Sequence, residues 1–420
     1  MKKSGRDRRP YVKPVTRIEL PQINVKARVI LLVVFLAIGV VALITGMMSM
    51  LSTEPGWQQI EVNPQERNCS GDFVFYYDFT DSDSATAEHK QLNNLYSQLT
   101  TSAYQIFTAD EQISDVGNVY TLNAHVNEIV TVDPVLYQAL ELLVSSGSRY
   151  PFLAPVNVEY NRVFIAENDD EAARYDPIKS PQLQPYIRQT AAYAADPDMV
   201  SLELMGNNQA RLNVAQEYLD YGRENEIETY FDFDWMKNAF IVDYMAQQLQ
   251  SQGFTKGYLA SYDGFTRNLD SRGVEYGVNV FHLQGVDLYQ PAQLIYDTPM
   301  SIVNLRSYAM SDLDKWHYYS YASGETLTIF LDPADGMSKS SIDTLTCYSE
   351  SMGCAQILME AAPVFIADAF SEERLLDMAG ENVYSVWCRG TVVRHTDPKD
   401  RIALVSDGGL VYTIEQALAS

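Results

Sequence analysis

The chain has 420 residues, of which 30 are lysine or arginine and 55 are aspartate or glutamate, so its formal net charge is −25. Because a polyanion repels a phosphate backbone, this charge argues against nucleic acid as a partner. The roughly 350 residues that follow the N-terminal region suffice for one large domain or two ordinary ones.

The N-terminal region is electrically opposite to the rest of the chain. Residues 1–28 hold nine lysines and arginines against two acidic residues, a charge of 9 − 2 = +7, which leaves −25 − 7 = −32 for everything after them. Residues 29–51 form an uncharged apolar run of 23 residues. A helix of this length spans the ~30 Å hydrocarbon core of a bilayer. We therefore expect a transmembrane anchor at 29–51 and a basic cytoplasmic tail at 1–28, since positive flanks stay inside.

A cleaved signal peptide is the rival interpretation of the apolar run. Its hydrophobic region should be about 7–15 residues long and end in a small-x-small cleavage site, whereas this run is longer and continues into "STEPGWQQ". The sequence thus predicts a single-pass protein of the cell membrane with its N-terminus in the cytoplasm. A polar linker at 52–71 then leads to an extracytoplasmic domain at 72–420.

The four cysteines all follow the predicted anchor. Cys69, Cys347, Cys354 and Cys388 would lie outside the membrane, where disulfides are chemically allowed. Four cysteines permit three pairings, and the spacing does not choose among them. No C-x-x-C occurs, so neither a zinc ribbon nor a thioredoxin-type site is supported.

The predicted outer domain mixes helices with mostly antiparallel strands, which indicates an α+β fold. Apolar residues at helical spacing predict helices that begin at a cap, Ser84 or Thr86, and run to 107, and at 132–148, 236–253 and 351–362. Alternating and β-branched runs predict strands at 72–80, 162–169, 199–214 (a hairpin around Asn207-Asn208), 256–262, 275–283, 300–310, 325–332, 341–349, 387–395 and 402–413. An acidic, proline-containing stretch at about 167–198 is expected to be an insertion loop with some helix.

Motifs of common chemistries are missing from the sequence. None of the five histidines pairs at i, i+4, and neither a Walker loop nor a G-x-G-x-x-G occurs. "DPADG" at 332–336 closes an apolar strand with two carboxylates and a glycine, but it lacks the alternate acidic positions of a calcium loop. Taken alone it predicts a turn. The residues by themselves indicate no more than an anchored, outward-facing α+β domain.

The order of several phrases resembles a known family. "ISDVGNVYTLNAH" and "VTVDPVLYQALELLVSSGS" are followed by "FDFDWMKNAFIVDYMAQQLQSQG", then by "TIFLDPADGMS" and the helix with "CAQILMEAAPVF". In this order and spacing, from about residue 72 to about 415, the chain is similar to FAD:protein FMN transferases, the ApbE family. The resemblance implies an ApbE-like fold with FAD and Mg²⁺ outside the cytoplasmic membrane. It also implies transfer of FMN to a threonine or serine of a target protein.

The matched positions are only partly those of the family. By resemblance, Asp243, Gly264, Asp332 and Gly336 are retained cofactor-binding positions, together with Pro333. The family's metal-binding Asp and Thr, four apart on the late helix, fall at Gln356 and Glu360. Other family residues are replaced as well: a histidine by Ile329, a glycine by Asp263, a threonine by Leu153 and a lysine by Asn238, with Lys237 one residue off register.

These replacements share a direction, because cationic or metal-gathering groups become neutral, apolar or acidic. We therefore expect a divergent domain without FMN transfer, which binds a flavin or a protein partner at the outer membrane surface. The alternative is an active, divergent FAD:protein FMN transferase. In that case Glu360, with Asp332 or Asp335, would hold the metal and serve the reaction.

Overall fold

A nine-stranded sheet forms the centre of the structure, a computed structural model that describes residues 55–62, 67–82, 84–405 and 409–418. The strands pair antiparallel except for the last two, which are parallel. Their order is β1 (Trp57–Gln59), β2 (Phe73–Asp78), β6 (Gly257–Ser261), β7 (Phe265–Asn268), β10 (Met300–Arg306), β13 (Thr344–Ser349), β14 (Tyr384–Arg389), β15 (Val392–His395) and β17 (Thr413–Gln416). The mixed α+β class with antiparallel sheets is thus confirmed.

The predicted tail at 1–28 and the predicted anchor at 29–51 lie outside the described residues. Within the part that is described, which falls in the unit Glu54–Ser420, no helix combines the length and the apolarity that crossing a bilayer requires. The anchor stays a prediction from the sequence.

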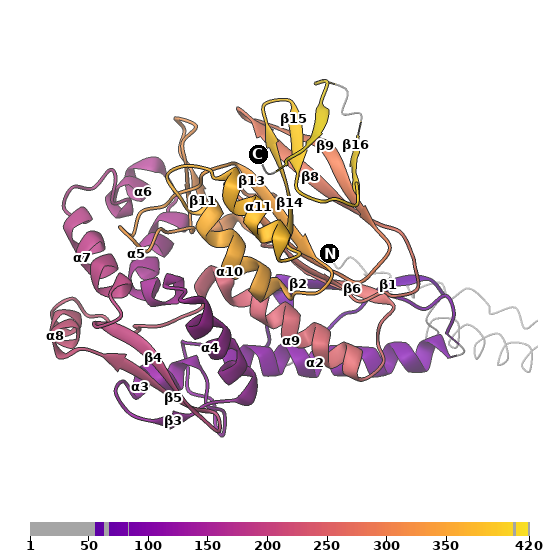
Figure 1. Cartoon of the computed structure of the whole chain (residues 1–420). Coiled ribbons are helices and arrows are strands. Elements are labelled where there is room, and N and C mark those ends of the chain that lie inside the picture. The colour runs from indigo at the N-terminus through magenta and orange to yellow at the C-terminus, as the bar shows by residue number, and fades with distance from the viewer. Residues whose placement is uncertain (1–54, 63–66, 83, 406–408, 419–420) are drawn as a thin grey trace, which may run out of the picture. The chain divides into compact units, whose positions relative to one another are not determined.

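Three helices cover one face of the large sheet: α2 (Ala85–Phe107), α9 (Lys237–Ser251) and α10 (Cys354–Phe365) (Figure 1). In β2, Phe73, Phe75 and Tyr77 alternate inward and are almost completely buried. Alternation of this kind places one face of a strand against a core and leaves the other for solvent or a further layer. The main hydrophobic core therefore lies between this face and the helices.

A three-stranded sheet packs against the opposite face. Its strands are β16 (Ile402–Leu404), β9 (Asp287–Tyr296) and β8 (Tyr276–Gln284), in that order. A second, smaller core forms where Val280 and Leu294 of this sheet meet Ile302 and Val386 of the large one. The small sheet contacts β13 and β14, so it covers the C-terminal half of the large sheet.

The middle of the chain adds a helical region with a third sheet, whose strand order is β3-β5-β4. The Asn207-Asn208 turn joins β4 and β5 with both residues at positive φ, 53° and 58°, as tight hairpin turns require. This confirms the predicted hairpin. The elements of the region are α3 (Val119–Ala124), β3 (Val130–Thr131), α4 (Pro134–Ser146), α5 (Ala154–Phe164), α6 (Asp169–Tyr175), α7 (Gln184–Ala195), β4 (Val200–Gly206), β5 (Gln209–Val214) and α8 (Gln216–Glu224).

The strand predicted at 162–169 is wrong. Residues 154–164 form α5, and its buried residues Val156, Tyr160 and Val163 recur at helical spacing. "RVF" therefore continues the helix rather than starting a strand. The expected insertion at about 167–198 contains α6 and α7, and α7 packs on α5 and β4.

All four cysteines carry free thiols in the structure. Burial raises the pKa of Cys69, Cys347 and Cys388 to about 12. These thiols are therefore protonated at neutral pH and behave as small apolar side chains.

The remaining short elements are β11 (Tyr318–Ser320), β12 (Thr326–Thr328) and α11 (Glu372–Gly380).

Candidate functional site

The matched positions gather around the start of α9, the β6–β7 turn, the 329–336 segment and α10. Helix α9 packs on β6, β7 and α10, and Phe330 contacts Trp235 and, in α10, Phe365, so these four segments are neighbours in space. What each side chain does there can be read from its contacts.

Asp243 holds the beginning of α10. Its Oδ1 accepts a hydrogen bond from the Cys354 N–H at 2.9 Å and its Oδ2 accepts one from the Ala355 N–H, also at 2.9 Å. The Arg267 guanidinium donates to Oδ1 at 2.6 Å. Since a helix N-terminus has unpaired N–H groups and a positive dipole end, a carboxylate in this place is stabilising. A Cβ at Gly353 would come within 2.4 Å of Oδ2, which explains why glycine stands at this position.

The two predicted metal positions lie on the exposed side of α10. Gln356 and Glu360 are both exposed, and the Gln356 Oε1 accepts a hydrogen bond from the Gly353 N–H at 3.3 Å. Gln356 lines a cleft of about 500 Å³ together with Asp243 and Arg267, whereas Glu360 is not among its lining residues. No group of three or more His, Cys, Asp or Glu side chains in the described part of the chain is arranged to hold a metal ion.

The "DPADG" segment forms the predicted turn. The Gly336 N–H donates to the Asp332 carbonyl at 2.8 Å, and Gly336 has a φ of +71°, a left-handed conformation that favours glycine. The Asp332 Oδ1 accepts from the Ala334 N–H at 2.9 Å. A Cβ at Gly336 would also approach Ile187 and Ala191 of α7 to 3.0 Å.

A lysine neutralises the carboxylates at this turn. The Lys339 ammonium lies 2.8 Å from Asp332, 3.0 Å from Asp335 and 2.9 Å from Asp368. Burial lowers the pKa of Lys339, but its hydrogen bonds to the three aspartates outweigh this effect, and the pKa is raised above the ordinary value. Asp332 and Asp335, which the alternative prediction assigns to a metal, are thus bonded to a cation of the chain itself.

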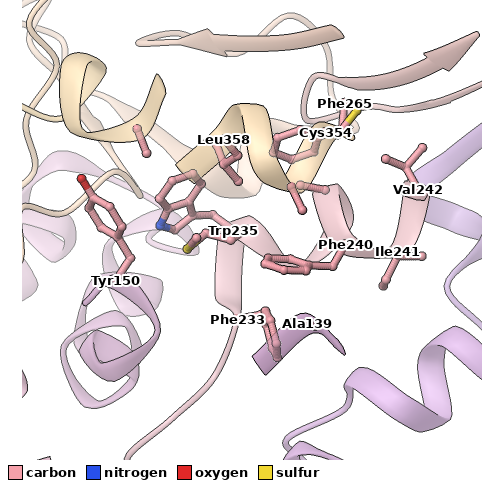
Figure 2. Packing of buried hydrophobic residues seen from close by; sticks show 14 of the residues in the cluster. Ala139, Tyr150, Phe233, Trp235, Phe240, Ile241, Val242, Phe265, Cys354 and Leu358 are labelled. Atoms are coloured by element: carbon pink, nitrogen blue, oxygen red, sulfur yellow. The ribbon is translucent and has the colours of Figure 1, made fainter. Parts of the chain in front are cut away.

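Aromatic side chains fill the space between these segments. The Trp235 ring lies 5.1 Å from the Phe330 ring and 5.7 Å from the Tyr150 ring, both nearly perpendicular to it. Phe330 in turn lies 5.1 Å from Phe365 of α10. Figure 2 shows the Trp235 indole between Tyr150 and Leu358. The start of α9, the 329–331 segment and α10 therefore enclose a packed core.

Gly264 has a structural reason to be glycine. Its φ is +115°, and a Cβ there would come within 2.3 Å of the Asn304 carbonyl oxygen. Its own carbonyl accepts a hydrogen bond from the Asn304 N–H at 2.9 Å. The close approach of the β6–β7 turn to β10 excludes any side chain at this position.

A small polar cleft of about 200 Å³ lies at the neighbouring Asp263. Asn238 donates to the Asp263 Oδ2 at 2.8 Å. Burial raises the pKa of Asp263, and burial together with Asp263 raises the pKa of Asp72. Burial also lowers the pKa of His317, which lines the same cleft. Among the described residues, the carboxyl groups of this cleft outnumber its one lining lysine, Lys237, which lies 3.8 Å from Asp232.

Sequence reasoning missed Asp72, Asp234 and His317 as members of this cleft. Burial raises the pKa of Asp234 to about 7, and the charge of Asp232 adds to the effect. Asp234 has a φ of +47°, and it stands in the "FDFDWMK" phrase where the family has glycine. That substitution was the available signal, whereas His317 comes from a distant segment with no motif.

No protein-family model and no curated protein matches the chain. The solved structure of the ApbE protein from Thermotoga maritima is similar, with a TM-score of 0.55 and 12% identity over 79% of this chain and 93% of that one. The chain has an ApbE-like fold. The predicted resemblance is thereby confirmed at the level of the fold.

Two further ApbE structures are similar to the chain. The flavin transferase ApbE from Vibrio cholerae covers 80% of this chain and 94% of its own, at 14% identity and a TM-score of 0.47. The flavinyl transferase ApbE from Pseudomonas stutzeri covers 76% and 88%, at 14% identity and a TM-score of 0.41. The roles predicted for individual site residues stay predictions.

The side chains at the matched positions do not fit a magnesium ion or the diphosphate of FAD. Magnesium requires hard oxygen donors in octahedral geometry, yet Asp243 and Asp332 are bonded to Arg267 and Lys339. A diphosphate is drawn to cations and to free backbone N–H groups; here it would meet Asp263, and the lysine of the same cleft, Lys237, is already paired with Asp232.

Proposed function

We propose that this chain is an anchored, outward-facing ApbE-like protein that has lost FMN transfer and acts by binding a protein partner at the membrane surface. One observation carries the proposal: the carboxylates retained at matched positions are engaged inside the fold. Asp243 holds the N-terminus of α10 and Arg267, and Asp332 is bonded to Lys339.

The aromatic core argues against a flavin between the start of α9, the 329–331 segment and α10. Trp235, Phe330 and Phe365 pack edge to face with centroid distances of 5.1 Å. Opening room for a flavin between them would break these contacts. Aromatic pairs of this kind contribute about 0.5–1.5 kcal/mol each beyond the area they bury, so an opening of this core is disfavoured.

The proposal is tested by an FMN-transfer assay. The full-length chain, purified in a maltoside detergent, is incubated with FAD, Mg²⁺ and an acceptor peptide that carries a central threonine. Flavin fluorescence of the peptide and its mass are measured, with the Vibrio cholerae flavin transferase as the positive control. We expect no covalent FMN above the enzyme-free blank. Labelled peptide would contradict the proposal and establish the alternative of an active, divergent transferase.

A restoration variant tests the assignment of the metal positions. Gln356→Asp combined with Glu360→Thr returns the family's residue types to α10. Because Asp243 and Asp332 remain bonded to cations of the chain, we expect this double variant to remain inactive in the same assay. Activity in the double variant would show that only the two α10 positions had been lost.

A further inference from the structure

An aromatic cleft lies on the other face of the large sheet, away from the site described above. It has a volume of about 480 Å³ and lies where β1, β2 and β6 meet β8 and β9 of the small sheet. Trp57, Tyr76, Tyr258, Tyr276 and Tyr296 line it, together with Glu275. These side chains come from five strands that the sequence does not place together.

Three of the rings that line the cleft lie close together with their planes tilted relative to one another. The centroids of Trp57, Tyr258 and Tyr276 form a triangle with sides of 6.3, 6.0 and 6.3 Å. The ring planes meet at 46° (Trp57 with Tyr258), 89° (Trp57 with Tyr276) and 82° (Tyr258 with Tyr276). A flat platform would hold its rings coplanar, whereas these three rings border the cleft at different angles, an arrangement that we call the aromatic cage. Cages of this kind bind quaternary ammonium groups, because each ring face attracts a cation within about 6 Å.

The cage is held in place before any ligand arrives. Tyr76 stacks on Tyr258 at 5.5 Å, and the almost fully buried Tyr296 stacks on Tyr276 at 5.8 Å. The Tyr276 hydroxyl also donates to the Asp270 carboxylate at 2.8 Å. Asp270 is itself held by Arg272 at 2.7 Å, which fixes the partner of this hydroxyl. A preformed site loses less conformational entropy when it binds.

Glu275 is the one charged side chain among the described residues that line the cleft. Glu275 is exposed and lines the cleft, and it takes part in none of the ion pairs of the described residues. An adjoining cleft of about 360 Å³ shares Glu275 and adds Asp297 and Asp400. Its one cation, Arg401, is bonded to Asp397 and Glu350. A positive ligand is favoured here, and a ligand that carries a phosphate is disfavoured.

We propose that this cleft binds a small organic cation with a quaternary ammonium group and no phosphate, held by Trp57, Tyr258 and Tyr276 and by the carboxylate of Glu275. Choline is the probe for this class. Its neutral isostere, 3,3-dimethylbutanol, has the same shape without the charge, and phosphocholine adds an anion. The site does not depend on the FMN-transfer positions, so the two proposals stand or fall separately.

The test is a calorimetric titration of the full-length chain in maltoside detergent with the three probes. We expect choline to bind at least tenfold more tightly than 3,3-dimethylbutanol and more tightly than phosphocholine. Equal affinity for choline and its neutral isostere, or no binding of choline at 20 mM, would overturn the proposal. Phosphocholine binding as tightly as choline would overturn the exclusion of phosphate.

Matched variants locate the site. Trp57→Leu should weaken choline binding about tenfold or more, and Glu275→Gln about threefold to tenfold. The control is Trp316→Leu, because Trp316 is also an exposed tryptophan (54%, against 43% for Trp57) but lies outside the cleft. Trp57→Phe keeps an aromatic face and should restore most of the affinity. Choline binding unchanged in both Trp57→Leu and Glu275→Gln would contradict the assignment.

Discussion

The replacement of Asp243 by alanine tests whether this carboxylate is a structural group. In the structure it accepts two hydrogen bonds from N–H groups at the start of α10 and one from Arg267. Removing a helix cap costs about 0.5–2 kcal/mol, and the loss of a negative charge at a helix N-terminus costs about 0.3–1 kcal/mol more. The Arg267 guanidinium, whose side chain is 21% exposed, would also lose its partner. We expect the free energy of unfolding to fall by about 3 kcal/mol.

The assay is urea and thermal unfolding of Asp243→Ala in the presence of EDTA. Unfolding entropies of about 2.1 cal/mol/K per residue imply about 1.3 °C per kcal/mol for a domain of some 360 residues, so Tm should fall by ~4 °C. Asp243→Asn keeps one acceptor oxygen and should cost about half as much. Asp377→Ala is the matched control, because Asp377 is an exposed aspartate on α11, and it should change stability by less than about 0.5 kcal/mol.

A metal-binding role for Asp243 predicts a different pattern. A carboxylate reserved for a cation is destabilising without it, so Asp243→Ala would leave the metal-free chain unchanged or more stable. Mg²⁺ would also raise the Tm of the wild-type chain by mass action. A loss below about 1 kcal/mol in EDTA, or a rise in Tm of the wild-type chain with Mg²⁺, would refute the structural reading.

Three further predictions concern Lys339, Asp234 and Gly264. Hydrogen bonds raise the pKa of Lys339 in the folded state. Its contribution to stability is therefore complete below about pH 10 and is lost as pH rises above that value. Lys339→Met should abolish this alkaline loss, which urea midpoints at pH 8 and pH 11 would show. Burial raises the pKa of Asp234 to about 7, so the free energy of unfolding should fall as pH rises from about 4 to 7, because the folded state then has to bury a charge or hold a proton. Asp234→Asn should stabilise the chain at pH 8 but not at pH 4. Asparagine tolerates the positive φ of this position, so the substitution adds no backbone strain. Gly264→Ala should cost more than about 2 kcal/mol in urea unfolding, because its Cβ would meet the Asn304 carbonyl at 2.3 Å; a change below 0.5 kcal/mol would contradict that contact.

Much of the fold could be predicted because its signals are local. Helix α4 is capped at its N-terminus by Asp133, whose Oδ1 accepts a hydrogen bond from the Val135 N–H, and at its C-terminus by Gly147, which has a φ of +66°. The strand at β2 and the Asn207-Asn208 hairpin follow from alternation and turn residues in the same way. The error at 162–169 came from a short β-branched run, which periodicity alone does not distinguish from the end of a helix.

The candidate site depends on partners that are far apart in the sequence. Asp243 lies 111 residues before Cys354, whose N–H it accepts, and Asp368 joins Lys339 from the loop after α10. Sequence resemblance located Asp243 and Asp332 but gave no indication that each is bonded to a cation of the chain. Such pairings are set by tertiary packing, for which a single sequence carries no periodic signal.

The most direct test of the central claim is a calorimetric titration of the full-length chain with FAD, with and without Mg²⁺. If the retained carboxylates are engaged in the fold and the aromatic core fills the space between them, Mg²⁺ should leave the weak or undetectable FAD signal unchanged. Tight FAD binding that requires Mg²⁺ would contradict the account and favour an active transferase.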